Sequence, residues 1–126
     1  MKEYKGIPYV IHYYDQVQHF NAYIRIPEGH PWEKFIDKVE LIFGKEIHNG
    51  YYDIPLEVHG GLTFSHRIGS DYAIWPQGFN QGAWVGWSYG HDLDDDLIDW
   101  TEEMIEQDCE RAIDQLLSFN KSKEPR

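Results

Sequence analysis

The sequence is poor in cysteine and in basic residues, and it contains no long hydrophobic run. Cys109 is the single cysteine among 126 residues, which excludes an intrachain disulfide and a zinc site built from several cysteines. No stretch approaches the roughly 18 to 20 consecutive apolar residues that a membrane-spanning helix needs. The first 15 residues lack the apolar segment and cleavage pattern of a signal peptide. We therefore expect a soluble, cytoplasmic protein without a membrane partner.

The shortage of basic residues gives the chain a strongly negative charge. Lys and Arg number 11 against 22 Asp and Glu, for a formal net charge of −11. A field of this sign repels phosphate backbones, so direct binding to nucleic acid is disfavoured. A basic protein partner or a cation complements the same charge. Aromatic residues make up 16% of the chain, enough to build a core and to line a ligand cleft as well.

Two strands and a helix are predicted in the first half of the chain. Residues 9–14 are rich in strand formers, and residues 20–26 alternate apolar with polar side chains, so the two segments predict a hairpin. A helix is predicted over 31–43, with Pro31 in its first turn and Gly44 at its C-terminal cap. Its apolar residues recur at helical spacing: Trp32, Phe35, Ile36, Val39, Ile42 and Phe43.

Further strands and a long helix are predicted in the second half. Residues 56–65 and 83–90 alternate as strands, the first interrupted by Gly60 and Gly61, and a short strand is expected near 71–75. Beyond residue 91 an acidic helix is indicated by an apolar stripe: Leu97, Ile98, Met104, Ile105, Cys109, Ala112, Ile113, Leu116 and Leu117. The predicted fold is α+β, a mostly antiparallel sheet covered by a central helix and a long acidic C-terminal helix. Residues 1–120 would form one domain, and 121–126 a polar tail.

Seven histidines could supply chemistry, and His59 and His91 are the strongest candidates. Each closes a predicted strand beside a glycine, and Asp92 follows His91. His59, His91 and Asp92 could ligate a metal, although no paired-histidine spacing supports such a site. The two histidines could also act as general acid and base, with Glu57 to orient His59 and Ser65 or Thr63 as nucleophile. The plainest alternative is that both are hydrogen-bonded at strand ends.

The acidic stretch 92–103 partly copies a calcium-binding loop. Asp92, Asp94, Asp96 and Glu103 stand at ligand positions of such a loop, but Leu97 replaces the glycine that the loop needs at its turn. A solvated acidic helix start therefore explains this stretch better. No phosphate-binding glycine loop occurs, and no motif specifies a cofactor.

Three stretches carry a resemblance to known sequences: PEGHPW (27–32), LEVHGGLTFS (56–65) and AWVGWSYGHDLDD (83–95). Together they resemble a group of small, largely uncharacterised phage and prophage proteins, over roughly the middle half of the chain. The resemblance implies expression in an infected or lysogenic bacterium, and it brings no established activity. It marks seven residues for testing: His30, His59, Gly60, Gly61, Trp87, His91 and Asp92.

Two functions from different classes follow. The first is a phage-type accessory protein that binds a basic host protein or a small ligand, with inhibition of a host defence as one form of this function. Its docking face would include Asp94, Asp95 and Asp96, and its ligand cleft would include four further residues: Trp87, Tyr89, Gly60 and Gly61. The second is a small metal-assisted or histidine-dependent hydrolase centred on His59 and His91. The binding protein is preferred because the sequence shows no complete catalytic set.

Overall fold

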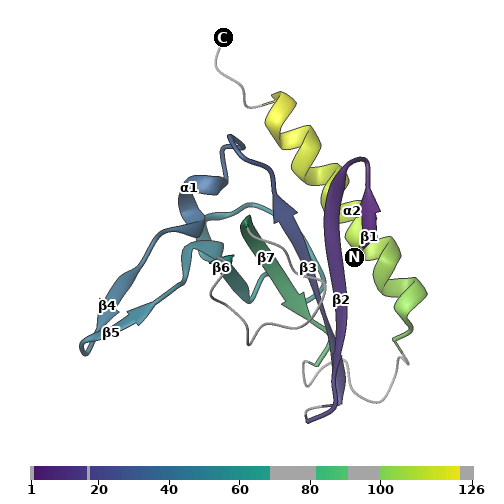
Figure 1. The fold of residues 1–126 in the computed structure, drawn as a ribbon, viewed down its shortest axis with the longest axis horizontal. Helices are drawn as coiled ribbons and strands as arrows, with labels where there is room; N and C mark the ends of the chain where they lie inside the picture. Colours follow the sequence, from purple (N-terminus) through teal and green to yellow (C-terminus); the bar gives the residue numbers. More distant parts are fainter. Residues whose placement is uncertain (1, 17, 69–81, 91–99, 123–126) are drawn as a thin grey trace.

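The computed structural model describes residues 2–16, 18–68, 82–90 and 100–122 (Figure 1). Its centre is a five-stranded antiparallel sheet with strand order β1-β2-β3-β7-β6. The strands are β1 (Lys2–Tyr4), β2 (Ile7–Tyr14), β3 (His19–Ile26), β6 (Phe64–Ile68) and β7 (Gly82–Ser88). The long helix α2 (Glu102–Ser122) packs against this sheet. The predicted α+β class and the predicted first hairpin are therefore confirmed.

Both faces of the sheet bury apolar side chains, whereas the alternation of residues 20–26 predicts one apolar and one polar face. On the face toward α2, the main core contains Ala22, Ile24, Ile26, Val85 and Trp87. On the opposite face, Val10, Tyr23, Ile68 and Trp84 form a smaller cluster. Gly86 permits this second cluster, because a Cβ at that position would overlap the ring of Tyr23.

Helix α2 forms because one stripe of its surface is apolar and its first turn is capped. Ile105, Cys109, Ala112, Ile113 and Leu116 are fully buried at helical spacing. The hydroxyl of Thr101 accepts a hydrogen bond from the backbone N–H of Met104 at 3.2 Å, a cap that stabilises a helix by about 1 kcal/mol. Leu97 and Ile98 lie outside the described residues. The helix continues to Ser122.

The central helix predicted over 31–43 is wrong in extent. Helix α1 spans only Glu33–Ile36, and the rest of the segment enters a separate two-stranded sheet, β4 (Glu40–Ile42) and β5 (Lys45–Ile47). Phe43 and Gly44 have φ angles of +52° and +77°, which close a two-residue hairpin turn. Of the predicted apolar stripe, Trp32 and Ile36 are buried, whereas Val39, Ile42 and Phe43 are exposed.

The strand predicted over 56–65 is also wrong, because pairing begins only at Phe64. Gly60 and Gly61 have φ angles of +70° and +83°, and the N–H of Gly61 donates to the carbonyl of Val58 at 3.0 Å. Two successive residues at positive φ take the chain out of the extended conformation and form a turn. The 3₁₀ helix η1 (Gly50–Asp53) precedes this segment. The short strand expected near 71–75 lies outside the described residues. Within the described part of the chain, no helix combines the length and apolarity needed to cross a bilayer.

Candidate functional site

The turn at Gly60 and Gly61 places His59 among aromatic rings. The His59 ring stacks on Tyr89, with centroids 4.9 Å apart and planes 7° apart. Trp100 approaches the edge of the same imidazole, with ring centroids 4.7 Å apart, and lies 4.7 Å from Tyr89. His59 is half-buried, and Tyr89 is buried. His59 in the loop, Tyr89 just after β7 and Trp100, two residues before α2, thus form one aromatic wall.

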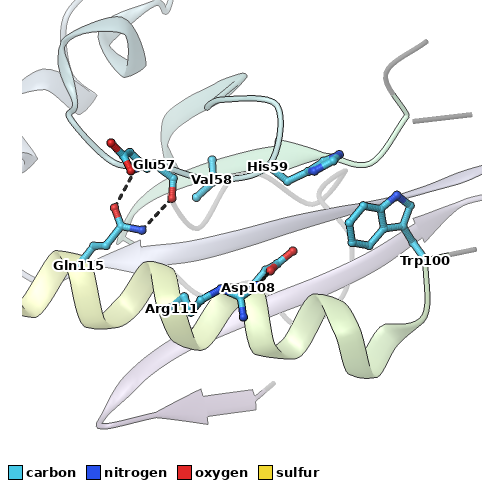
Figure 2. A pocket seen from close by; sticks show the side chains of 7 residues that line it. All are labelled: Glu57, Val58, His59, Trp100, Asp108, Arg111 and Gln115. Carbon is cyan, nitrogen blue, oxygen red and sulfur yellow. Dashed lines mark hydrogen bonds and ion pairs between the residues drawn. The ribbon is translucent and has the colours of Figure 1, made fainter. Parts of the chain in front are cut away.

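A cavity of about 370 Å³ lies between this wall and α2 (Figure 2). This volume falls in the range of small-molecule sites. Figure 2 shows the Asp108 carboxylate rising from α2 toward the space between His59 and Trp100. The residues that line the cavity are Glu57, Val58, His59, Trp100, Asp108, Arg111 and Gln115. The cavity therefore combines aromatic surface, two carboxylates and one guanidinium.

A chain of hydrogen bonds fixes the Asp108 carboxylate. The Trp87 indole N–H donates to the Tyr89 hydroxyl at 2.9 Å, and the Tyr89 hydroxyl donates to Asp108 Oδ2 at 2.6 Å. Because an indole N–H can only donate, it occupies a lone pair of the Tyr89 oxygen and leaves the tyrosine proton for Asp108. The Asp108 side chain is 16% exposed and pairs with the Arg111 guanidinium, which is 65% exposed.

Gln115 fixes the opposite wall of the cavity. Its side-chain amide accepts a hydrogen bond from the Glu57 N–H at 2.9 Å and donates one to the Glu57 carbonyl at 2.7 Å. The two bonds, drawn as dashed lines in Figure 2, replace the strand pairing that residues 56–59 lack. The loop that carries His59 is therefore tied to α2 on one side and stacked on Tyr89 on the other.

The residues predicted for the site lie in different places in the structure. Trp87 is 1% exposed and supports Tyr89 from within the core. Gly60 and Gly61 are exposed in the turn that presents His59. The predicted partners His91, Asp92, Asp94, Asp95 and Asp96 lie outside the described residues. Among the residues that are described, no group of three or more His, Cys, Asp or Glu side chains could hold a metal ion. The metal set of His59, His91 and Asp92 stays a prediction, because two of its three members lie outside the described residues.

His30, marked by the resemblance, is a buried anchor for α2. Its Nε2 lies 2.8 Å from the Leu116 carbonyl, and its Nδ1 accepts the Trp32 backbone N–H at 3.1 Å. A carbonyl only accepts and a backbone N–H only donates, so the neutral ring must carry its proton on Nε2. Burial lowers the pKa of His30, and the hydrogen bond to Leu116 opposes part of that shift.

Four residues that line the cavity were not predicted from the sequence as site residues: Trp100, Asp108, Arg111 and Gln115. Asp108 and Gln115 lie seven residues apart, two helical turns, beside the apolar stripe of α2. Polar residues at the edge of a buried stripe lie where a helix meets its neighbours. That spacing is the signal that could have found them. Comparison with protein-family models, with curated proteins and with solved structures gives no match to this chain.

Proposed function

We propose that this chain is a non-catalytic binding protein whose cavity beside His59 accepts a guanidinium or ammonium group. The observation that carries the proposal is the mostly buried Asp108 carboxylate, held by Tyr89 at the base of an aromatic-walled cavity. The cation could belong to a small molecule or to a basic side chain of a protein partner. Its setting is a phage-type accessory protein in the bacterial cytoplasm, which the motifs PEGHPW, LEVHGGLTFS and AWVGWSYGHDLDD support.

The chemistry of the cavity favours a cation. Aromatic faces attract positive charge, and a carboxylate pairs with a guanidinium through two parallel hydrogen bonds. Glu57 and Asp108 against Arg111 leave the lining with a formal charge of −1 (two negative charges and one positive). The net charge of −11 raises the concentration of cations around the whole chain.

Arg111 occupies the position that a ligand would take. Its pair with Asp108 joins residues three apart on the helix, and the guanidinium is largely exposed. Ion pairs between residues three apart on a helix contribute only about 0.2–0.5 kcal/mol in isolated helices, and the Arg111 end of this pair is already in contact with solvent. An incoming guanidinium can therefore displace Arg111 into solvent at small cost, and the aromatic wall supplies contact that solvent does not.

The proposal is tested by calorimetric titration with agmatine and arginine, using citrulline as the uncharged isostere of arginine. We expect agmatine and arginine to bind and citrulline to bind at least about tenfold more weakly, because charged hydrogen bonds contribute roughly 1.5–3 kcal/mol. Asp108→Asn should weaken agmatine binding by a similar factor. Glu103→Gln removes the same charge from an exposed position of α2 and should leave binding within about twofold.

Two outcomes of this titration contradict the proposal. The first is equal binding of citrulline and arginine, and the second is an Asp108→Asn variant with unchanged affinity. The source of the cation is decided by comparing agmatine with a short arginine-containing peptide. Much tighter binding of the peptide points to a protein partner, and equal binding points to a small molecule.

A hydrolase centred on His59 and His91 is the alternative proposal, and it has a separate test. It requires metal in the purified protein or hydrolysis of an activated ester, and both should be lost in a His59→Ala His91→Ala double mutant. A purified protein that contains no metal and has no esterase activity, yet binds agmatine, would contradict the hydrolase and support the binding function.

A further inference from the structure

The β4–β5 hairpin exposes apolar side chains that belong to neither core cluster of the described residues. All residues from 37 to 47 are exposed, and Figure 1 shows the hairpin extending away from both the five-stranded sheet and α2. Phe43 at its tip is fully exposed, at 101%, and Leu41 is 74% exposed. Val39, Ile42 and Ile47 are exposed as well. We call residues 39–47 the docking arm.

Within the described part of the chain, neither face of the docking arm is covered. Cross-strand pairing puts Ile42 with Lys45 and Glu40 with Ile47 on one face. The pair Leu41 and Glu46 lies on the other face. All six side chains are exposed. An isolated two-stranded hairpin is marginally stable in water, so apolar residues placed on both of its faces without a covering element add little to the stability of the monomer.

Phe43 is also unfavourable for the turn that it occupies. Its φ angle is +52°, and positions of this kind in two-residue hairpin turns favour Asn, Asp or Gly. A bulky side chain in this region of φ is an outlier that calls for an explanation. Both its backbone conformation and its exposure therefore argue that Phe43 serves contact with another molecule.

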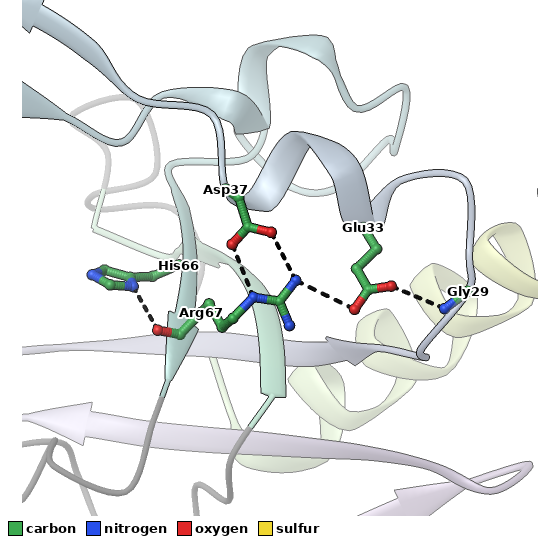
Figure 3. Close-up of polar contacts among 5 residues, drawn as sticks. All are labelled: Gly29, Glu33, Asp37, His66 and Arg67. Carbon is green, nitrogen blue, oxygen red and sulfur yellow. Dashed lines mark hydrogen bonds and ion pairs between the residues drawn. The ribbon is translucent and has the colours of Figure 1, made fainter.

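The base of the docking arm is held firmly although its tip is bare. Asp37, two residues before the arm, accepts two hydrogen bonds from Arg67 of β6, at 2.8 and 2.9 Å. Arg67 also contacts Glu33 at 3.3 Å, and Glu33 accepts the Gly29 N–H at 2.9 Å (Figure 3). The guanidinium of Arg67 holds the pKa of Asp37 below its usual value.

Two further contacts hold the base of the arm. Lys38 pairs with Asp53 at 2.7 Å. After the arm, His48 stacks on His66 of β6, with ring centroids 4.5 Å apart. Contacts on both sides of the hairpin fix its direction before any partner binds, which lowers the entropy lost on association.

We propose that the docking arm inserts Phe43 into an apolar pocket of a partner protein whose pocket rim is positively charged. Charge complementarity selects this partner. The chain carries −11, and within the arm Glu40 and Glu46 outnumber Lys45. A second copy, an anionic bilayer and a nucleic acid are all repelled by that charge. Aromatic residues such as Phe are enriched in protein–protein interfaces relative to the rest of the surface. This surface uses none of the residues of the cavity beside His59, so it is independent of the proposed cation site.

The test uses the full chain with Phe43 replaced by the photo-crosslinking residue benzoylphenylalanine. The protein is irradiated in a bacterial lysate, and a cross-linked protein is identified, purified and titrated with the unlabelled chain. We expect a basic protein whose affinity falls at least tenfold with Phe43→Ser and falls as salt is raised. Met104→Gln removes an exposed apolar side chain from α2 and should change the affinity by less than twofold.

Several results would contradict the proposed role of the docking arm. The first is a set of cross-links at position 43 that also forms when the cross-linker replaces Met104, or no cross-link at all. The second is a cross-linked protein whose affinity for the chain does not change with Phe43→Ser. Dimerisation of the wild type in analytical ultracentrifugation that Phe43→Ser abolishes would make a second copy the occupant. Sedimentation with vesicles of zwitterionic phosphatidylcholine that depends on Phe43 would make it a lipid surface. Phe43 is fully exposed, so thermal unfolding of the variant checks that it remains folded.

Discussion

At the scale of single residues, Tyr89 connects the core to the cavity. Its hydroxyl accepts the Trp87 indole N–H and donates to Asp108, and its ring carries His59. In this series of hydrogen bonds, Trp87 is buried in the core and the Asp108 carboxylate at the other end is partly exposed. A single hydroxyl thus satisfies a buried donor and orients a carboxylate.

Removing that hydroxyl should destabilise the protein and weaken the cation site together. In Tyr89→Phe the Trp87 N–H loses its acceptor, and a buried donor without a partner costs roughly 1–3 kcal/mol. Urea unfolding measures the loss, and the agmatine titration measures the site. Tyr13→Phe, which alters an exposed tyrosine of β2, should change stability by less than about 0.5 kcal/mol. A Tyr89→Phe protein as stable as the wild type would contradict the hydrogen-bond chain.

His30 should make stability depend on pH. Its pKa is lowered by burial from 6.5 in the unfolded chain, so the unfolded chain takes up the proton first as the pH falls. The stabilisation is therefore complete above about pH 6.5 and is lost as the pH falls toward the lower pKa of the folded state. NMR titration of the His30 ring, with urea midpoints at pH 7.5 and pH 5, checks this. A His30 pKa at or above 6.5 in the folded protein would contradict it.

At the scale of elements, the best sequence predictions concern segments with one apolar face packed against a core. The stripe from Ile105 to Leu116 faces the sheet, and the apolar positions Ala22, Ile24 and Ile26 of β3 lie in the main core. The helix over 31–43 fails because Val39, Ile42 and Phe43 show helical spacing without a covering surface. The strand predicted over 56–65 fails at its start because the backbone of Glu57 forms hydrogen bonds with Gln115, 58 residues away, and not with a neighbouring strand. The hydrophobic period of a sequence shows neither whether a surface covers the segment nor whether a distant residue satisfies its backbone.

The docking arm should become more stable when its turn is given a residue suited to positive φ. We expect Phe43→Asn to stabilise the protein by roughly 0.5–1 kcal/mol, because Asn adopts this conformation more easily and the change removes exposed apolar surface. The midpoint of urea unfolding measures the gain. Leu41→Asn lies in β4 outside the turn and should give no such gain. A destabilised Phe43→Asn protein would show that Phe43 packs within the monomer.

At the scale of the whole molecule, the charge of −11 dominates the electrostatics. Paired charges such as Lys2 with Glu106 and Lys5 with Asp114 fasten β1 to α2, yet the lysines are exposed and contribute little. Repulsion among the excess carboxylates opposes the compact state. The same excess favours cations in the cavity and a basic partner at the docking arm.

Salt should therefore stabilise the protein and weaken its binding. Raising ionic strength from about 0.01 to 0.15 M shortens the screening length from about 30 to 8 Å, which reduces carboxylate repulsion more than it weakens short ion pairs. We expect the melting temperature to rise by a few degrees and agmatine affinity to fall. Calorimetry in sodium chloride checks both. A melting temperature that falls with salt would mean that the surface ion pairs outweigh the repulsion.

The cation site beside His59 is tested most directly by NMR of the Trp100 indole N–H during titration with agmatine. The indole lies in the cavity wall next to His59, so its signal should shift progressively with agmatine. At the same concentrations citrulline should shift the signal far less, as should agmatine added to Asp108→Asn. An unmoved Trp100 signal with agmatine, or equal shifts with citrulline, would contradict a cation-binding cavity.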